Sequence, residues 1–354
     1  MKNQYQLPWL LLKNYKYFMK KNIIKKTANK ILVIGAGTWG TSLANHLAIN
    51  QNQVYLYSIE SDVINEINQK HTNSKYLLNI NLSKNLIATD KFINDVEMVF
   101  IVVPSDVAGL VFDQIKSTNF KKNCVFVICS KGFEKNTLSL LSDSFVKIVK
   151  NENFAVLSGP NFAIEVANQL PTITTIASLN KNIANKIIKV LKNENFNALY
   201  FNDPKTAEIC GIVKNILAIG CGLVDGLDLG VNAKSALLIK GINEIQMICK
   251  KIKASTDLVN PAGFGDIFLT CSSTKSRNNT LGTLIAKGQN PLKLSQKSPT
   301  KKITYEGVNS AKIIIEFAKK LKLKLDLCET IAKILDNDFT PSQIKNLLVK
   351  VIVN

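Results

Sequence analysis

A single lysine interrupts one of the most apolar stretches of this chain of 354 residues. Lys214 is flanked by Ile212, Val213, Ile216 and Leu217, in a segment whose periodicity predicts a helix. Burial disfavours the charged form of an amine, so a lysine in this setting would titrate in the range that general acid–base catalysis needs. The alternative is a lysine whose stem lies along the edge of the helix and whose ammonium reaches water.

The composition also favours lysine for this chemistry. Histidine occurs only twice, which excludes a site built from several imidazoles. Lys131, in a Ser-Lys-Gly turn after a predicted strand, would meet a polar substrate, or it would be an ordinary surface lysine. Asp266, at a predicted helix start bounded by glycines, would pair with a catalytic ammonium, and Asn215 would help to orient Lys214.

The chain contains one arginine, Arg277, which lies between Ser276 and Asn278. A planar guanidinium binds phosphate through two parallel hydrogen bonds, which the ammonium of lysine does not form. In a sequence that otherwise uses lysine, this donor-rich triplet predicts a phosphate-binding site.

The positive charge of the chain is spread along its length. Its net charge is +19, from 45 basic and 26 acidic residues. A nucleic-acid-binding protein usually concentrates such charge on one face or tail, so we predict compositional drift and no nucleic-acid partner. Polyanion binding, which would show as a salt-sensitive affinity for DNA, is the alternative. The excess charge would still steer small anionic metabolites toward the protein.

Residues 35–40, Gly-Ala-Gly-Thr-Trp-Gly, have the G-x-G-x-x-G spacing and lie between a predicted strand and a predicted helix. In that context Gly35 allows a tight turn, Gly37 lets the backbone approach a pyrophosphate, and Gly40 lets the helix pack on the strand. The amide groups at the start of the helix would then bind phosphate. The alternative is a glycine-rich turn that binds no ligand.

Glu60 follows the second predicted strand, about twenty residues after this fingerprint. An acidic side chain there accepts hydrogen bonds from the adenosine ribose and repels a 2′-phosphate, so it favours NAD over NADP. The alternative is a solvated surface glutamate. No arginine lies nearby in the sequence to bind the 2′-phosphate of NADP, although a lysine would serve. We therefore expect NAD or NADP as cofactor, with NAD favoured.

The spacing of apolar residues predicts the elements that would position these groups. Short apolar runs predict strands at 31–34, 53–57, 99–103, 125–129, 154–157, 172–177 and 197–200. Helical periodicity between them predicts helices at 38–49, 61–69, 106–117, 137–150 and 181–192. After about Asp203 only helical periodicity remains, at 206–222, 233–252, 264–271, 278–287, 308–321, 328–336 and 341–350.

This alternation predicts an α/β fold, with an N-terminal Rossmann-type doubly wound sheet of parallel strands followed by an all-α C-terminal domain. We expect an NAD(P)-binding domain at residues 30–203 and a helical substrate-binding and catalytic domain at residues 204–354. Residues 1–29 fit neither pattern. They are predicted to be a poorly ordered N-terminal extension or a mis-assigned start, with a weak membrane-surface anchor as the alternative.

The cysteines and the hydropathy pattern bear on the compartment. Seven cysteines without a C-x-x-C pair are typical of a reduced protein that has neither disulfides nor a zinc site. No run approaches 18 apolar residues, so we predict no stable membrane insertion. A cytoplasmic protein without a bound metal is therefore expected.

The chain resembles the bacterial NAD(P)-dependent sn-glycerol-3-phosphate dehydrogenase family from about Ile31 to its C-terminus. The segments that carry the resemblance are GAGTWGTSLA (35–44), VVPS (102–105), SKGFE (130–134), SGPNFAIEVANQLPT (158–172), GIVKNILAIGCG (211–222), LGVNAKSAL (229–237), AGFGD (262–266), SRN (276–278) and EG (306–307). So many motifs in this order are far more specific than a lone dinucleotide fingerprint.

With the motifs above, the resemblance implies a role for each matching residue. The catalytic residues would be Lys214, as proton acceptor, with Lys131 and Asp266. Substrate contacts would come from Lys131, Gly159, Asn161, Lys214, Asn215, Asp266, Thr270, Ser276, Arg277 and Asn278. Cofactor contacts would come from Gly35, Gly37, Thr38, Trp39, Gly40, Glu60, Lys131, Ala163, Arg277 and Glu306.

The activity that the resemblance implies is reversible hydride transfer between NAD(P)H and dihydroxyacetone phosphate. The product would be sn-glycerol 3-phosphate for glycerophospholipid synthesis, with Lys214 as general acid and base. Ile59 stands just before Glu60, where many members carry a basic residue or histidine, which leaves the use of NADP open. A homodimer is likewise left open.

Two rival functions remain at this stage. A β-hydroxyacid dehydrogenase or a ketopantoate-type reductase also combines a dinucleotide-binding domain with a helical domain and a lysine base, but the AGFGD and SRN segments argue against both. A non-catalytic cofactor-binding sensor would have no need of Lys131, Lys214, Asp266 and Arg277 together.

Overall fold

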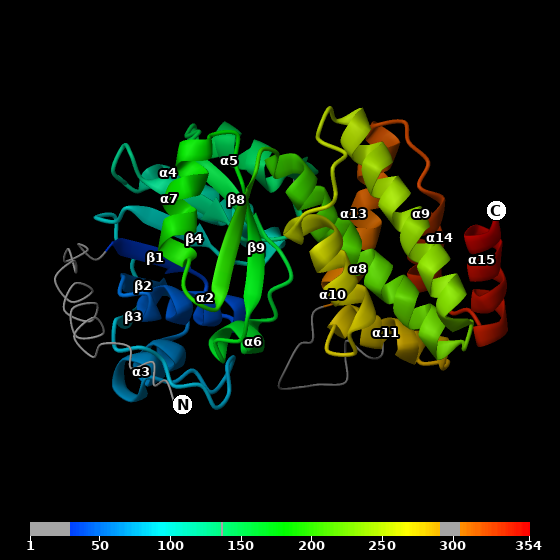
Figure 1. The fold of residues 1–354 in the computed structure, drawn as a ribbon, viewed down its shortest axis with the longest axis horizontal. Coiled ribbons are helices and arrows are strands. Elements are labelled where there is room, and N and C mark those ends of the chain that lie inside the picture. The colour runs from blue at the N-terminus through cyan, green and yellow to red at the C-terminus, as the bar shows by residue number, and fades with distance from the viewer. Residues whose placement is uncertain (1–28, 136, 291–304) are drawn as a thin grey trace, which may run out of the picture.

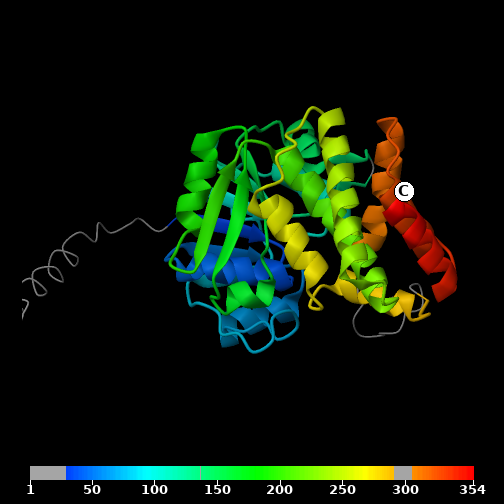
Figure 2. The ribbon, with the colours of Figure 1, turned by 45° about the vertical axis from the view of Figure 1, so that its right-hand side comes forward.

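The computed structural model describes residues 29–135, 137–290 and 305–354. A sheet covered by helices lies beside a group of helices, with α8 (Pro204–Gly226) running from the border into the helical group (Figures 1 and 2). The predicted N-terminal extension falls, apart from Asn29, outside the described residues.

The sheet has eight strands in the order β10-β9-β8-β5-β4-β1-β2-β3. Their bounds are β1 Lys30–Ile34, β2 Gln53–Tyr57, β3 Leu86–Thr89, β4 Met98–Ile101, β5 Val125–Ile128, β8 Phe154–Ser158, β9 Thr172–Ala177 and β10 Phe196–Phe201. All neighbours pair in parallel except β8 and β9, which are antiparallel. The prediction of parallel pairing is therefore wrong for this pair. A parallel crossover usually contains a full helix, whereas the five-residue helix α6 (Ala163–Ala167) is all that separates β8 from β9.

Helices cover both faces of the sheet, as the doubly wound prediction requires. The helices of this part are α2 Thr38–Ile49, α3 Ser61–Lys70, α4 Ser105–Ser117, α5 Leu141–Val149 and α7 Lys181–Leu191. Side chains alternate along β1, so Ile31 and Val33 join one buried cluster, with α2 and α7, while Leu32 and Ile34 join another, with α4 and α5. The predicted fold class is confirmed.

Two short elements differ from the sequence prediction. Strand β3 was not expected, because its four residues, Leu-Ile-Ala-Thr, form no long apolar run. The helix predicted at 137–150 begins only at Leu141. Before it, β6 (Phe133–Glu134) and β7 (Ser139–Leu140) form an antiparallel pair, and Leu138 has a positive φ of 52°, which no α-helix accommodates.

The described residues of the C-terminal part form helices joined by short loops, with no strand among them. This part consists of α8, α9 Gly230–Lys251, η1 Pro261–Gly265, α10 Asp266–Ser272, α11 Arg277–Ala286, α13 Glu306–Lys320, α14 Asp326–Asp336 and α15 Pro341–Val353. The change of sequence pattern near Asp203 coincides with the end of β10 and the start of α8, whose first amides are capped by the Asp203 carboxylate. Phe133 of the β6–β7 pair packs into the helical core, against Phe317.

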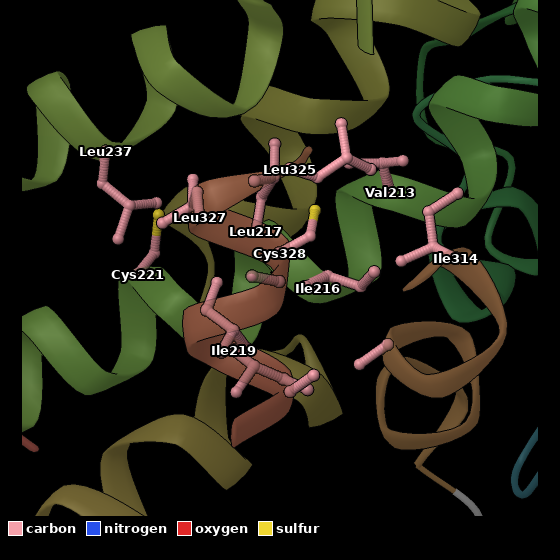
Figure 3. Packing of buried hydrophobic residues seen from close by; sticks show 14 of the residues in the cluster. Val213, Ile216, Leu217, Ile219, Cys221, Leu237, Ile314, Leu325, Leu327 and Cys328 are labelled. Carbon is pink, nitrogen blue, oxygen red and sulfur yellow. The ribbon is translucent and has the colours of Figure 1, made fainter. Parts of the chain in front are cut away.

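Helix α8 is the centre of the helical core. It is the one described helix long and apolar enough to cross a membrane, with a mean hydropathy of 1.7, and its most apolar window is entirely buried in the protein. Leu217 and Cys221 of α8 lie in one cluster with Leu237 of α9 and Cys328 of α14 (Figure 3). Its apolar character therefore follows from its burial between the surrounding helices and the sheet.

Glycines let another helix approach α8 closely. A Cβ at Gly222 would overlap the carbonyl oxygen of Asn279 in α11, and a Cβ at Gly220 would lie 2.9 Å from Ile331 in α14. A Cβ at Gly211 would make ordinary contact, 3.5 Å from the side chain of Lys131. These helix-interior glycines, which disfavour a helix by roughly 1 kcal/mol each, are thus explained by close packing at Gly220 and Gly222.

Candidate active site

The glycine fingerprint forms the turn between β1 and α2. Gly35 has a φ of +111°, and a Cβ there would lie 2.5 Å from the carbonyl oxygen of Val102. A Cβ at Gly40 would overlap the carbonyl oxygen of Gly35, whereas one at Gly37 would meet no described atom within 4 Å. The three glycines therefore have the geometry expected of them: a tight turn, an open backbone and close helix packing.

The N-terminus of α2 fits an anionic group. Gly37 is the N-cap residue, no side chain of the described residues caps the helix, and the first turn contains no acidic residue. Thr38 is exposed beside this turn and Trp39 is half-buried against the sheet core. The open space beside Gly37, which we call the pyrophosphate cradle, and the uncapped amides at the positive end of α2 together suit a pyrophosphate.

Glu60 lies where β2 leads into α3 and is not an isolated surface glutamate. Tyr76 donates a hydrogen bond of 2.5 Å to its Oε1, and Lys75 forms an ion pair with its Oε2. Lys75 and Tyr76 belong to the segment between α3 and β3. Sequence reasoning missed both residues, because only folding brings this segment back to the end of β2.

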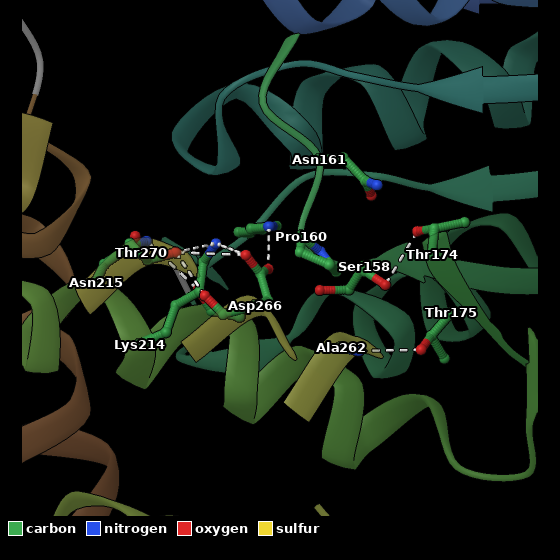
Figure 4. A network of polar contacts seen from close by, with 12 residues as sticks. Ser158, Pro160, Asn161, Thr174, Thr175, Lys214, Asn215, Ala262, Asp266 and Thr270 are labelled. Carbon is green, nitrogen blue, oxygen red and sulfur yellow. Dashed lines mark hydrogen bonds and ion pairs between the residues drawn. The ribbon is translucent and has the colours of Figure 1, made fainter. Parts of the chain in front are cut away.

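Two lysines share one buried carboxylate at the border between the sheet and the helices. Figure 4 shows Lys214, Asp266 and Thr270 of this cluster. Lys214 Nζ lies 2.5 Å from Asp266 Oδ1, and Lys131 Nζ lies 2.8 Å from Asp266 Oδ2. Lys214 also donates to Thr270 Oγ1 at 3.1 Å. The side chains of Asp266 and Lys214 are 2% and 9% exposed, against 25% for Lys131, so the alternative of a solvated Lys214 is wrong.

Burial and neighbouring charges set the protonation of these three groups. Burial lowers the pKa of Lys214 to about 8; the Asp266 carboxylate opposes this shift and the Lys131 ammonium adds to it. Burial acts on Lys131 in the same direction, but Asp266 outweighs it and keeps the pKa of Lys131 above its usual value. Burial would raise the pKa of Asp266, yet the two ammoniums hold it below its usual value.

Three elements bring this cluster together. Lys131 follows β5, and Lys214 lies in the middle of α8. Asp266 is the first residue of α10 and directly follows the π-helical turn η1. The regular helix therefore begins at 266 and not at the predicted residue 264, because η1, in which Gly263 has non-helical backbone angles, precedes it. The amide of Ala262 in this turn donates to Thr175 Oγ1 at 3.0 Å and so ties η1 to β9 (Figure 4).

The turn after β8 carries two buried polar atoms without a partner among the described residues. Asn161 donates to Thr172 Oγ1 at 2.9 Å and to the Ile173 carbonyl at 3.0 Å, but its Oδ1 accepts nothing. The hydroxyl of Ser158 is likewise unpaired. Sequence reasoning missed Ser158, whose position directly before the predicted Gly159 was the available signal.

Gly159 and Ala163 have packing roles in this turn. A Cβ at Gly159 would lie 2.9 Å from Cα of Thr174 in β9, so the backbones run close together there. The carbonyl of Ala163 accepts a hydrogen bond of 2.7 Å from Ser42 Oγ, which joins α6 to α2. The turn is therefore held directly against the fingerprint helix.

A chain of amides runs along the helical side of the site. Asn278 donates to Asn215 Oδ1 at 3.0 Å and accepts from the Gly307 amide at 3.1 Å, and Asn215 donates to Glu306 Oε2 at 3.4 Å. Within the described residues, Asn215 and Lys214 form no hydrogen bond with each other, so Asn215 does not orient that lysine directly as predicted. It instead anchors α11 and α13 next to α8.

The predicted phosphate triplet begins α11. The hydroxyl of Ser276 caps this helix by accepting from the Asn279 amide at 3.4 Å, and Asn278 is buried. Arg277 is exposed, and its guanidinium has no ion pair or hydrogen bond within the described part of the chain. Its backbone is fixed beside the site by the neighbouring Asn278.

Two family models together span most of the chain. The NAD-dependent glycerol-3-phosphate dehydrogenase N-terminus matches residues 30–184, and the C-terminus of the same enzyme matches residues 203–346. The chain belongs to this family. A relative named glycerol-3-phosphate dehydrogenase (NAD(P)+), from Wolbachia sp. subsp. Brugia malayi, is 34% identical over 313 residues, which are 86% of this chain and 95% of the relative. The chain is thus an oxidoreductase, and the expected cofactor, NAD or NADP, is confirmed.

Solved structures agree with this family assignment. A glycerol-3-phosphate dehydrogenase from Coxiella burnetii, at 31% identity, superposes with a TM-score of 0.85 and covers 92% of this chain and 99% of its own. A ketopantoate reductase from Ralstonia eutropha, of one rival class, covers 91% of this chain and 99% of its own, at 10% identity and a TM-score of 0.56. That second likeness shows the shared fold alone.

Proposed function

We propose that this protein catalyses reversible hydride transfer between NAD(P)H and dihydroxyacetone phosphate, giving sn-glycerol 3-phosphate for glycerophospholipid synthesis. The observation that carries the proposal is the Lys131–Asp266–Lys214 cluster at the carboxyl edge of a dinucleotide-binding sheet. Ligands of such sheets bind at this edge. The seven free, buried cysteines support a reducing, cytoplasmic location.

The fingerprint turn and the end of β2 would hold the cofactor. Gly37 and the first amides of α2 suit its pyrophosphate, and Glu60 suits its adenosine ribose. When bound, the nicotinamide supplies or accepts the hydride, and the protein supplies orientation and proton transfer.

Lys214 is the proposed proton donor and acceptor at the C2 oxygen of the substrate. In the reducing direction its ammonium protonates the oxygen on which negative charge develops. In the oxidising direction its neutral amine removes the hydroxyl proton. Asp266 and Thr270 hold the Lys214 nitrogen through contacts of 2.5 and 3.1 Å, so the amine is positioned before substrate binds.

The substrate phosphate is assigned to Arg277, whose exposed guanidinium has no competing partner in the described residues. Lys131 shares Asp266 with Lys214, so two ammoniums and one carboxylate leave a net positive charge beside an anionic substrate. Asn161, with its unpaired and buried Oδ1, is the proposed acceptor for a substrate hydroxyl.

The deciding experiment measures oxidation of NADH by the purified protein with dihydroxyacetone phosphate and, separately, with ketopantoate. We expect turnover with the first substrate only, and its near-complete loss in Lys214→Ala. Turnover with ketopantoate alone would replace the proposed function by that of the rival class.

A further inference from the structure

The end of β2 carries a cation that the local sequence does not provide. Ile59, directly before Glu60, is 86% exposed and apolar, so no base stands at that position. Lys75, in the segment after α3, supplies the positive charge instead. Its Nζ forms an ion pair with Glu60 Oε2 and lies 3.5 Å from Asp62 Oδ2. Tyr76 covers the other oxygen of Glu60.

The segment that carries Lys75 is fixed to the fingerprint. Asn73, which is fully buried, donates to the Ala36 carbonyl at 3.1 Å and to Thr41 Oγ1 at 2.8 Å. The Ser74 amide donates to Glu66 Oε1 of α3 at 2.8 Å. Lys75 is therefore held at the ribose end of the proposed cofactor site by a built structure, rather than by the chance position of a long side chain.

The chemistry of this end distinguishes the two dinucleotides. The 2′-hydroxyl of NAD needs an acceptor, which a carboxylate supplies, whereas the 2′-phosphate of NADP needs a cation and is repelled by a lone carboxylate. We propose that Lys75 is the residue that admits the 2′-phosphate, so that the protein binds NADPH as well as NADH, and that Glu60 is the opposing determinant.

The ion pair can exchange partners readily. The side chains of Lys75 and Glu60 are 45% and 28% exposed, and exposed pairs contribute little to stability. A phosphate dianion would therefore draw the ammonium away from Glu60 at small cost, while Tyr76 keeps its hydrogen bond to the other carboxylate oxygen. The same side chains would thus serve either ribose.

Isothermal titration of NADPH and NADH into the wild-type protein and its variants tests this proposal without relying on turnover. In Lys75→Ala we expect about a tenfold weaker affinity for NADPH, the size of one lost charge-assisted hydrogen bond, and little change for NADH. Glu60→Gln should shift the preference the opposite way, because a neutral amide oxygen is a weaker acceptor for the ribose hydroxyls and does not repel a 2′-phosphate. Lys70→Ala, an exposed lysine at the end of α3, is the matched control and should change neither affinity.

A rescue separates a direct contact from a structural effect. Ile59→Lys, added to Lys75→Ala, places a cation beside Glu60 again and should restore NADPH affinity. Equal weakening of both dinucleotides, unchanged NADPH affinity in Lys75→Ala, or a wild type that binds NADH alone would overturn the role of Lys75. The inference rests on the proposed function only for its cofactor. If NADPH binding depends on Lys75 but the protein does not reduce dihydroxyacetone phosphate, the proposed reaction is wrong, while Lys75 remains the residue that admits the 2′-phosphate.

Discussion

Lys131 and Lys214 bind different oxygens of one carboxylate, Asp266, from opposite sides of the border between the sheet and the helices. The two ammoniums are not equivalent, because Lys214 is the more buried and its pKa falls to about 8, while Asp266 keeps the pKa of Lys131 above its usual value. Lys214 is therefore suited to exchange a proton near neutral pH, and Lys131 to remain charged beside an anionic substrate.

The pH dependence of the two directions follows from the lowered pKa of Lys214. In the proposed mechanism, oxidation of glycerol 3-phosphate needs the neutral amine, so kcat/KM should rise with pH through about 8. Reduction needs the ammonium, so its kcat/KM should fall over the same range. In Asp266→Asn the carboxylate that raises this pKa is gone, so both inflections should move to lower pH. Profiles that do not move in this variant would argue that another group titrates.

Removing the amine tests its role directly. Lys214→Ala should lower kcat by about 100-fold or more, which is the usual contribution of a general acid or base. Cofactor affinity should stay nearly unchanged, because Lys214 lies away from the fingerprint turn. Steady-state kinetics and NADH titration of the same preparation measure the two effects, and full turnover in this variant would remove Lys214 as the proton carrier.

Arg277→Lys retains the charge but loses the planar pair of donors. We expect the KM for dihydroxyacetone phosphate to rise about tenfold, with a smaller change in kcat, since one bidentate phosphate contact is replaced by a single one. Lys275→Arg, an exposed change two residues earlier, is the matched control. An unchanged KM in Arg277→Lys would assign the phosphate to another group.

The sequence predicted the parts of the site that depend on local pattern. The fingerprint turn, the apolar setting of Lys214 and the helix start at Asp266 each lie within a short segment, and the structure brings Lys131, Lys214 and Asp266 together as expected. The α/β architecture followed from the alternation of strands and helices, because periodicity is a local property of long elements.

What the sequence did not predict depends on contacts between distant segments. Lys75 reaches Glu60 only because Asn73 fixes its segment to the fingerprint, and Asn215 joins α11 to α13 rather than orienting Lys214. Strand β3 and the β6–β7 pair are too short to carry a periodic signal, and pairing with neighbours defines them.

Two glycines should respond differently to alanine. Gly37 has extended backbone angles that alanine adopts and meets no described atom, so Gly37→Ala should leave the melting temperature unchanged but weaken cofactor binding about tenfold, because its methyl group enters the pyrophosphate cradle. Gly222→Ala should destabilise the protein by about 1–3 kcal/mol, because α8 and α11 must separate. Thermal unfolding and NADH titration distinguish the two outcomes, and a destabilised Gly37→Ala would contradict the open cradle.

A second buried carboxylate lies away from the proposed chemistry. Glu208 of α8 is 4% exposed and accepts from the Ser142 amide at 3.0 Å and from the Ser142 hydroxyl, at the start of α5. Burial raises the pKa of Glu208 to about 7, and the two Ser142 donors only partly offset this shift. The residue thus links the helical part to the sheet through a group that titrates near neutral pH.

Stability should fall as pH rises because of Glu208. Below about pH 4.5 the side chain is protonated in both the folded and the unfolded chain. Between about pH 4.5 and 7 only the folded chain keeps the proton. The stabilisation that the raised pKa of Glu208 gives to the folded chain is therefore lost as pH rises to the folded pKa. Glu208→Gln resembles the protonated form and does not titrate. The difference between the free energies of unfolding of Glu208→Gln and of the wild type should therefore increase, in favour of the variant, by about 2 kcal/mol between pH 5 and pH 8. Urea unfolding at each pH measures it. A constant difference across this range would show that Glu208 does not titrate between these pH values.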